Sequence, residues 1–476
     1  MFRARVTRRQ ALALVGLGAT GAFLAACGGA APATQGAPTS APGKPTEATK
    51  AAGTQPQAAE PAKAAAGETK LVYWTFMPTK PRFEDRPALF EEFGKPHSAV
   101  IEVDDVSDFD KKLPPAYAAG ITPDLIDPTA PQPVQWAQQG FLVPVDDLVG
   151  QIGKDDFPPV ALDFATWEGK VYGLPLLGYP HVMHYHSDWL QEEGLQVPTT
   201  HDELIMAAKK LTGTTKEGQP RAGISAYMGN AGHSAVFFQN FVGPNEGYTF
   251  DKEGKTVVDS PEVFQAMKAV NTLVPHFEPG YKNLVYDETR NLFAERKIAI
   301  EIDSTSMGVT IIRKMKTDPK IAETVKSTLI PWGPSSKKDR SGFNGIAYFA
   351  IGSKTKQLDL AKQFLSWFYS KPIFTRAFLS YDWGLIPERI SVATDPEWLK
   401  KVPAPALAII KAGSEAVKYA TFPGQDWGPS PRANQVITHD TYRNLMFKIA
   451  DAKSDDEIRG ALQWAKQDIK QAIEQA

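Results

Sequence analysis

Four tryptophans stand where a folded chain could use them to hold a ligand. Trp74 ends an apolar run and Trp332 follows another, whereas Trp383 and Trp427 lie in segments punctuated by glycine and proline. Strand ends and irregular loops are the places where open α/β sheets bind ligands. Because an aromatic ring can stack on the apolar face of a sugar ring, these side chains predict a carbohydrate site. The alternative for each tryptophan is a place in the core.

Two aspartates follow apolar runs in the same way. Asp127 comes after Leu125-Ile126, and Asp303 comes after Ile302. Carboxylates at a strand end can accept hydrogen bonds from sugar hydroxyl groups at the rim of an otherwise apolar pocket. We therefore predict that both aspartates contact the ligand, with a role in a turn or a helix cap as the alternative.

The densest group of histidines is His181, His184 and His186. On a strand, positions 184 and 186 share one face and position 181 faces the other way, so the three rings cannot converge without a bulge. No cysteine lies near them. We expect ordinary strand and hinge residues here and no metal site.

Short motifs of catalysis are missing from the chain. The sequence contains no GxSxG, GxxxxGK[ST] or HExxH, and no GxGxxG after an apolar run. Paired carboxylates stay possible because there are 54 acidic residues. We therefore expect no catalytic residue and no cofactor, and keep an exported carbohydrate-active enzyme as the alternative.

The N-terminus has the features of an export signal. Four arginines and no acid precede an apolar stretch that stops at Cys27, the only cysteine. The tetrad LAAC at 24–27 resembles the bacterial lipoprotein signal, in which the cysteine is lipidated and becomes the new N-terminus. The alternative is a chance cysteine beside an ordinary signal peptide. The Arg8-Arg9 pair leaves open whether export follows the general or the twin-arginine route.

The segment after Cys27 cannot form a core. Residues 28–67 contain no Val, Ile, Leu, Met, Phe, Trp or Tyr, so they cannot bury enough apolar surface to offset the entropy of ordering. We predict a signal peptide over 1–26 and a disordered tether over 27–67 with a reach of roughly 35 Å. The folded body would then lie near the outer face of the cell membrane, anchored by lipid.

Charge and length limit the function further. The chain has 476 residues, 52 basic and 54 acidic, and without residues 1–26 the balance becomes 48 basic to 54 acidic. A mildly acidic body gives no electrostatic reason to expect a nucleic-acid partner. A length of about three common domains predicts two or more cores. A single cysteine excludes intramolecular disulfides and thiolate zinc cages.

The folded body begins with β–α–β alternation. The apolar runs at 71–76 and 100–103 predict strands, and 83–93 between them predicts a helix that buries Leu89, Phe90 and Phe93. Later helices are indicated by N-caps at Thr200, Ser260 and Ser454, and short apolar runs lie at 297–302 and 345–351. This alternation predicts α/β layers.

Eight stretches in order along the chain resemble the extracellular solute-binding proteins of ABC importers, in particular the sugar-binding group. They are AAGITPDL (118–125), GFLVPV (140–145), WEGKVYGLP (167–175), YHSDWL (185–190), PTTHDEL (198–204), FAERKIAI (293–300), GIAYFAI (345–351) and GLIP (384–387). The resemblance runs from about Lys70 to the C-terminus. The chain departs from the family pattern at His186, at His201 and at 303–306, and the last of these falls where a ligand would be contacted.

The resemblance implies a two-lobed α/β fold, the type II periplasmic-binding-protein-like fold, whose lobes are joined by hinge crossings and close over a ligand. Estimated crossings are Pro175, Ile302 and Gly345. Mapped onto this sequence, lobe one would hold 68–175 and 303–343, lobe two would hold 176–302 and 344–445, and the C-terminal helix at 446–476 would pack at the lobe boundary.

The function implied is that of a membrane-anchored, monomeric receptor. It would capture a carbohydrate and deliver it to the permease subunits of an ABC transporter. Polyols, polyamines and metal chelates stay open as alternative cargo. A surface adhesion or scaffold lipoprotein is the alternative from another class of function.

Overall fold

The computed structural model describes residues 68–76, 86–106, 108–379, 384–419, 421–425, 427, 430 and 432–474. All of them belong to one compact unit. The predictions for the signal peptide at 1–26, Cys27, the tether and Trp383 lie outside these residues.

A first group of strands begins with the predicted β–α–β unit. Strands β1 (Thr69–Thr75) and β2 (Ala99–Asp105) are parallel, and α3 (Arg86–His97) connects them with Leu89, Phe90 and Phe93 buried. β1 also pairs with β3 (Leu125–Ile126), and β11 (Asn344–Ile351) runs antiparallel to β3. The predicted strands and the inward face of the helix are confirmed.

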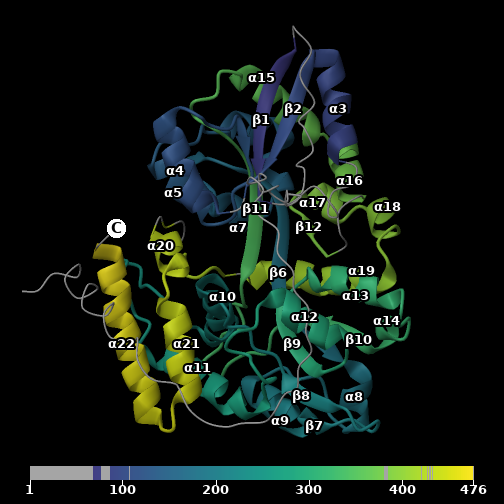
Figure 1. Ribbon diagram of the computed structural model, residues 1–476, viewed down its shortest axis with the longest axis vertical. Coiled ribbons are helices and arrows are strands. Elements are labelled where there is room, and N and C mark those ends of the chain that lie inside the picture. Colours follow the sequence, from purple (N-terminus) through teal and green to yellow (C-terminus); the bar gives the residue numbers. More distant parts are fainter. Residues whose placement is uncertain are drawn as a thin grey trace, which may run out of the picture. The chain divides into compact units, whose positions relative to one another are not determined.

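Short helices surround this first group in Figure 1. They are α4 (Phe109–Ala119), α5 (Gln132–Gln138), α6 (Asp146–Ile152), α7 (Pro159–Asp163), α15 (Leu358–Phe368), α16 (Lys371–Leu379), α17 (Ile390–Ala393) and α18 (Pro396–Leu399). A small hairpin of β4 (Thr166–Trp167) and β5 (Lys170–Val171) lies outside the large sheet. Phenylalanines of α3, α15 and α16 pack with β1 and β11 in one apolar core, and Trp367 lies at its edge.

A second group is built on β9 (Ile298–Ser304). This strand is parallel to β8 (Pro220–Ile224), which pairs at the sheet edge with β7 (Gly213–Thr214). The helices of this part are α8 (Ser187–Glu192), α9 (His201–Leu211), α10 (Ala231–Val242), α11 (Pro261–Leu273), α12 (Tyr286–Ala294), α13 (Met307–Met315), α14 (Ile321–Thr324), α20 (Arg432–Thr438), α21 (Thr441–Asp451) and α22 (Asp455–Glu474).

Strand β6 (Leu174–His186) joins the two groups. Its first part pairs with β11 and with β12 (Ile386–Pro387), and its second part pairs with β9 and β10 (Val325–Thr328). Helix α19 (Ala404–Ala416) also spans both groups, because Ile409 packs with the second while the adjacent Ile410 packs with the first. β6 and β11 run side by side between the two groups in Figure 1.

The predicted helix starts are confirmed by hydrogen bonds. Thr200 and Glu203 form a reciprocal capping box at α9, and the Ser260 hydroxyl accepts the Val263 N–H at α11. At α22, the Ser454 hydroxyl accepts the Glu457 N–H at 3.3 Å. Side-chain acceptors satisfy N–H groups that a helix start leaves unpaired. The apolar stripe of α22 is buried against α20 and α21.

The packing differs from the predicted division of the second half of the chain. Residues 344–402 pack with the first group through β11, α15 and α16, and α19 spans both groups, whereas 303–330 stay with the second group through β10, α13 and α14. Helices α20 to α22 also pack with the second group, at 436–469. Both groups have similar α/β alternation. The sequence therefore does not indicate which group a segment of the second half of the chain packs with.

Two of the three predicted crossings lie on strands that connect the groups. Pro175 is in β6 and Gly345 is in β11, whereas Ile302 packs inside the second group and is no crossing. The chain returns to the second group between Phe422 and Val436 instead.

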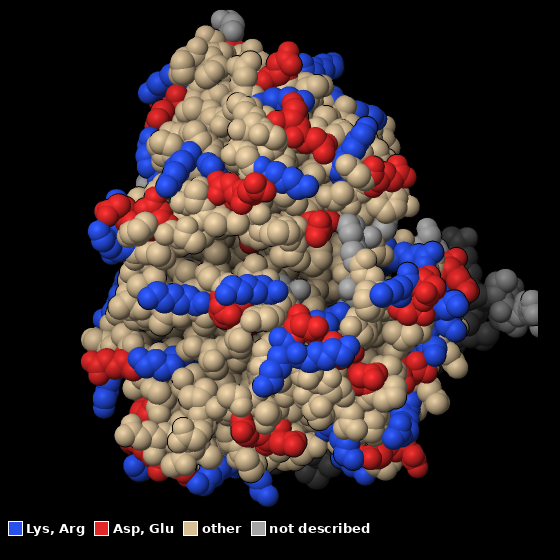
Figure 2. Space-filling view, turned by 180° about the vertical axis from the view of Figure 1, so that it is seen from behind, with Lys and Arg blue, Asp and Glu red and all other residues tan. Residues whose placement is uncertain are grey.

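Charges of both signs are interspersed over the face shown in Figure 2. Such a surface lacks the clustered basic residues of a nucleic-acid-binding face. Over the part of the chain that the structure describes, no helix is both long enough and apolar enough to cross a membrane.

Candidate functional site

A cavity of about 430 Å³ lies where the two groups of strands meet. Its walls come from the middle of β6, the ends of β1, β3 and β9, the first turns of α10 and α12, and the segments before β11 and around α20. The lining residues are Phe76, Thr129–Pro131, Leu177, Tyr179, His181, Gly232, His233, Val236, Val285–Asp287, Arg290, Ser304, Ser306, Phe343, Leu385, Phe422, Pro423, Asn434 and Ile437.

Strand β6 supplies one wall of the cavity by simple alternation. Leu177, Tyr179 and His181 all line the cavity, as expected of alternate positions on one strand face. Gly345 lies opposite Tyr179 in β11, and a Cβ atom there would overlap the tyrosine ring. Glycine at 345 is therefore what lets the ring lie across the neighbouring strand.

A second wall is an aromatic layer at the start of α12. The rings of Tyr286 and His233 are 3.9 Å apart, and Tyr286 also contacts Tyr227 at 4.6 Å. The Arg290 guanidinium lies 5.1 Å from the centre of the Tyr286 ring. The Asn230 side chain caps α10 by accepting the backbone N–H of His233 at 2.8 Å, which places His233 in the first turn of the helix.

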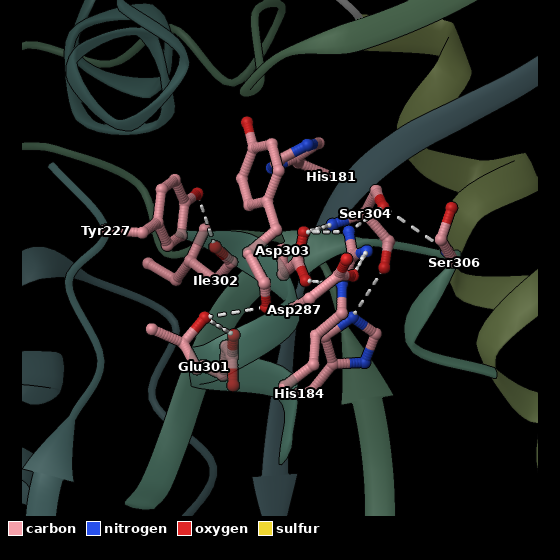
Figure 3. A network of polar contacts seen from close by, with 12 residues as sticks. His181, His184, Tyr227, Asp287, Glu301, Ile302, Asp303, Ser304 and Ser306 are labelled. Atoms are coloured by element: carbon pink, nitrogen blue, oxygen red, sulfur yellow. Dashed lines mark hydrogen bonds and ion pairs between the residues drawn. The ribbon is translucent and has the colours of Figure 1, made fainter. Parts of the chain in front are cut away.

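Next to this layer an ion pair links α12 to β9, within the polar network of Figure 3. Arg290 Nη2 donates to Asp303 Oδ1 at 2.9 Å and to Ser304 Oγ at 3.0 Å, and Nε donates to Asp303 Oδ2. Burial alone would raise the pKa of Asp303, but the charge and hydrogen bonds of Arg290 outweigh it and hold this pKa below its ordinary value. The pair is therefore ionised near neutral pH.

His181 is a neutral donor with a fixed tautomer. The Phe343 N–H donates to Asn240 Oδ1 at 3.0 Å, which leaves Asn240 Nδ2 as a donor, 3.0 Å from His181 Nδ1. Nδ1 must then accept, so Nε2 carries the proton. Burial lowers the pKa of His181 to about 3. The ring can therefore donate one hydrogen bond and carries no charge near neutral pH.

Two further buried groups of the network shown in Figure 3 are neutral. Burial, followed by the adjacent Asp303 carboxylate, raises the pKa of Glu301 well above its ordinary value, and Thr289 Oγ1 donates to it at 2.7 Å. Burial lowers the pKa of His184 to about 4, and its Nδ1 lies 2.8 Å from Ser327 Oγ. These groups stabilise β9 against β6 and α12, which fixes Asp303 and hence Arg290.

The two aspartates predicted to contact a ligand are both fully buried. Asp303 lies behind Arg290 and positions that side chain. Asp127 accepts hydrogen bonds from Tyr73 Oη at 2.8 Å and from the Phe76 N–H at 3.0 Å, and burial raises its pKa to about 7. It ties the end of β1 to β3 beside Phe76 and Thr129, which do line the cavity. Neither carboxylate is part of the cavity wall.

None of the three predicted tryptophans that the structure describes is among the residues that line the cavity. Trp74 packs against the small core beneath α4 and α5, and Trp332 is held by backbone hydrogen bonds to Thr199 and His201 at the start of α9. Trp427 is 48% exposed, stacks on Tyr248 at 4.8 Å and donates from Nε1 to the Phe250 carbonyl at 2.9 Å. Their predicted contact with a ligand stays a prediction.

Most of the wall residues were not predicted from the sequence. Tyr179, His233, Tyr286 and Arg290 come from a strand interior and from first turns of helices, where neither a turn motif nor an isolated tryptophan marks them. His181 was noticed, but as an ordinary strand residue. His181 lies on the opposite face of β6 from His184 and His186. This alternation was the signal in the sequence that its surroundings differ from theirs.

The cavity suits binding by stacking and hydrogen bonding. Aromatic faces and a few convergent polar groups are typical of small-molecule sites. In the part of the chain that the structure describes, no three His, Cys, Asp or Glu side chains are grouped to hold a metal ion.

Comparison with known proteins identifies relatives over most of the chain. Over 365 residues the chain is 25% identical to the maltotriose-binding protein of Pyrococcus abyssi, which covers 75% of this chain and 74% of the relative. It is 26% identical to the diacetylchitobiose-binding protein of Streptomyces coelicolor, over 63% of this chain and 69% of the relative.

A solved structure has the same fold. The ABC transporter solute-binding protein of Agrobacterium radiobacter K84, crystallised with ribitol, superimposes with a TM-score of 0.69 at 22% identity, covering 85% of this chain and 98% of that one. This likeness confirms the predicted two-lobed α/β fold, with the cavity at the junction of the two groups of strands.

The family model for bacterial extracellular solute-binding proteins matches residues 78–373, well over half of the sequence. This match agrees with the resemblance stated from the eight sequence stretches. The chain belongs to the bacterial extracellular solute-binding protein family.

Proposed function

We propose that this protein captures a sugar or a sugar alcohol in the cavity between its lobes and delivers it to the permease of an ABC importer. The observation that carries the proposal is the cavity itself, in which Tyr179 and Tyr286 offer aromatic faces beside hydrogen-bonding groups of His181, Arg290 and Ser304. Stacking faces with directed polar groups suit a polyhydroxylated ring or chain.

The relatives support this class of cargo. Their names specify maltotriose and diacetylchitobiose, and the neighbour with the same fold was crystallised with ribitol. The family consists of binding proteins, so we infer that the chain has no catalytic step. Binding and lobe closure are sufficient for a receptor.

A screen of sugars and sugar alcohols by thermal shift, followed by calorimetric titration and product analysis, tests the proposal. A ligand that binds only the folded state raises stability by about 2.7 kcal/mol at a hundredfold excess over Kd. We expect saturable binding with no product. Cleavage of the ligand would favour the carbohydrate-active enzyme, and absence of binding to any of them would favour the adhesion or scaffold role.

We also propose that the mature chain is a monomer anchored to the outer face of the cell membrane through lipid on Cys27. The LAAC sequence at the end of the apolar stretch supports this proposal. Cys27→Ser should release the protein from the membrane fraction. Retention of the variant in that fraction at high salt would contradict lipid anchoring.

A further inference from the structure

The only Lys or Arg in the described wall of the cavity is already neutralised by the chain's own acids. Arg290 Nη2 and Nε donate to Asp303, Nη2 also donates to Ser304 Oγ, and Nη1 lies 3.4 Å from Asp287 Oδ1. Each guanidinium nitrogen thus has an acceptor. An arginine in a binding cleft commonly binds an anionic ligand, but here the anions that Arg290 contacts are two carboxylates of the chain itself.

The imidazoles of the wall add no positive charge. Burial lowers the pKa of His181 to about 3 and that of His233 to about 4, so both rings are neutral near pH 7. The charged groups around Arg290 are thus one guanidinium and the two carboxylates that contact it, Asp287 and Asp303. This cluster therefore has a surplus of one negative charge.

Asp287 differs from Asp303 in access. The Asp303 side chain has no exposed surface, whereas that of Asp287 is 82% exposed in the first turn of α12 and, among the described residues, makes one long ion pair of 3.4 Å with Arg290. Asp287 is therefore the carboxylate that a solute in the cavity can reach. A carboxylate accepts hydrogen bonds from hydroxyl groups and from ammonium groups, and it repels a second carboxylate.

We propose, on the basis of the function proposed above, that the cavity selects sugars that are neutral or carry an amino group, that it rejects sugar acids, and that Asp287 determines this selectivity. Rejection of a competing solute by like charge is a common means of specificity. Charge thus restricts the solutes to neutral sugars and amino sugars.

The neutral, amino and acid forms of the same sugar test the proposal. Calorimetric titrations near pH 7 would compare glucose, glucosamine and glucuronate, and then galactose, galactosamine and galacturonate, with wild type and Asp287→Asn. For a skeleton that binds, we expect the acid to bind at least about tenfold more weakly than the neutral sugar, and the amine to bind at least as tightly.

The variant should change the charge ranking. Asp287→Asn should bring the affinities for acid and amine closer to the affinity for the neutral sugar, each compared as a ratio within one protein, and it should still fold because a surface carboxylate near Arg290 contributes little to structure. Glu295→Gln, at the exposed C-terminal end of the same helix, is the control and should keep the wild-type ranking at low and high salt.

Three outcomes would overturn the inference. One is an acid that binds wild type as tightly as its neutral parent, and another is an unchanged ranking in Asp287→Asn. The third is binding of no member of either series and of no other sugar or sugar alcohol, which would contradict the proposed function itself.

Discussion

Two buried carboxyl groups lie beside strand β6 and have opposite electrostatic states. Asp303 lies near the end of β9, and the adjacent Arg290 holds its pKa below the ordinary value against the effect of burial. Glu388 follows β12, which pairs with the first part of β6 on the same edge as β9, and burial raises its pKa to about 8. Its Oε2 atom has no hydrogen-bond partner among the described residues.

The surroundings of the two groups explain this difference. Asp303 faces α12, whose guanidinium supplies charge-assisted hydrogen bonds. Glu388 lies over Gly178, where a Cβ atom would overlap its Oε1 and would lie 3.8 Å from Asn344 Oδ1. A buried carboxyl group without a cation stays protonated. The comparison shows that an adjacent guanidinium, and not burial alone, determines whether a buried carboxyl group beside β6 is ionised.

Breaking the ion pair should give the largest effect. Asp303→Ala leaves the Arg290 guanidinium, whose side chain is 11% exposed, without its main partner. We expect a loss of about 3–5 kcal/mol in the free energy of unfolding, measured by chemical denaturation. Asp287→Ala, which removes the exposed partner of the same arginine, is the control and should cost less than about 1 kcal/mol. Equal losses would contradict the distinction between the two acids.

Glu388 should make the protein less stable as pH rises. The folded state keeps its proton up to a pKa of about 8, whereas an unfolded glutamate loses it near about 4.3. Stability should therefore fall between these values as pH rises, by at most about 1.4 kcal/mol per pH unit. Glu388→Gln cannot ionise, so it should flatten this part of the curve. Parallel curves for the variant and the wild type would show that Glu388 does not titrate as inferred.

Tyr286→Ala should weaken sugar binding by about 1–3 kcal/mol, because it removes a stacking face of the cavity. Trp427→Ala is the variant for comparison, and calorimetric titration measures the sugar affinity of both. If the cavity is the site, Trp427→Ala should keep affinity within about twofold, since exposed positions away from a site have small effects. The reverse result would favour the site predicted from tryptophan spacing.

The smallest effect is expected at a contact between the two groups of strands. Asn434, in α20, lines the cavity, and its Nδ2 donates to Gln135 Oε1 of α5 at 2.6 Å. Asn434→Ala should cost the liganded state about 1 kcal/mol, seen as faster ligand dissociation in stopped-flow measurements. Gln135→Ala should have the same effect, and the double variant should add nothing. Additive losses would show that the two side chains act independently.

More of the fold than of the site could be predicted from the sequence. Alternating apolar runs and helix caps are local signals, so β1, α3, β2 and the starts of α9 and α11 could be predicted. The wall of the cavity depends on tertiary pairing. Tyr179 faces it because β11 places Gly345 opposite, and Arg290 reaches it because α12 packs on β9. No local pattern encodes those contacts.

The predicted aspartates show the same limit. Both follow apolar runs as expected, but Asp127 and Asp303 are acceptors for Tyr73 and Arg290, not part of the cavity wall. Sequence position places a carboxylate at the end of a strand. The neighbouring elements decide whether solvent, a ligand or a buried donor meets it.

A crystal structure of the protein with a neutral sugar or sugar alcohol from the screen tests the central claim most directly. We expect electron density for the solute between Tyr179 and Tyr286, within hydrogen-bonding distance of His181 Nε2. Density against Trp427 or Trp332, with the cavity empty of solute, would contradict the assignment of the site.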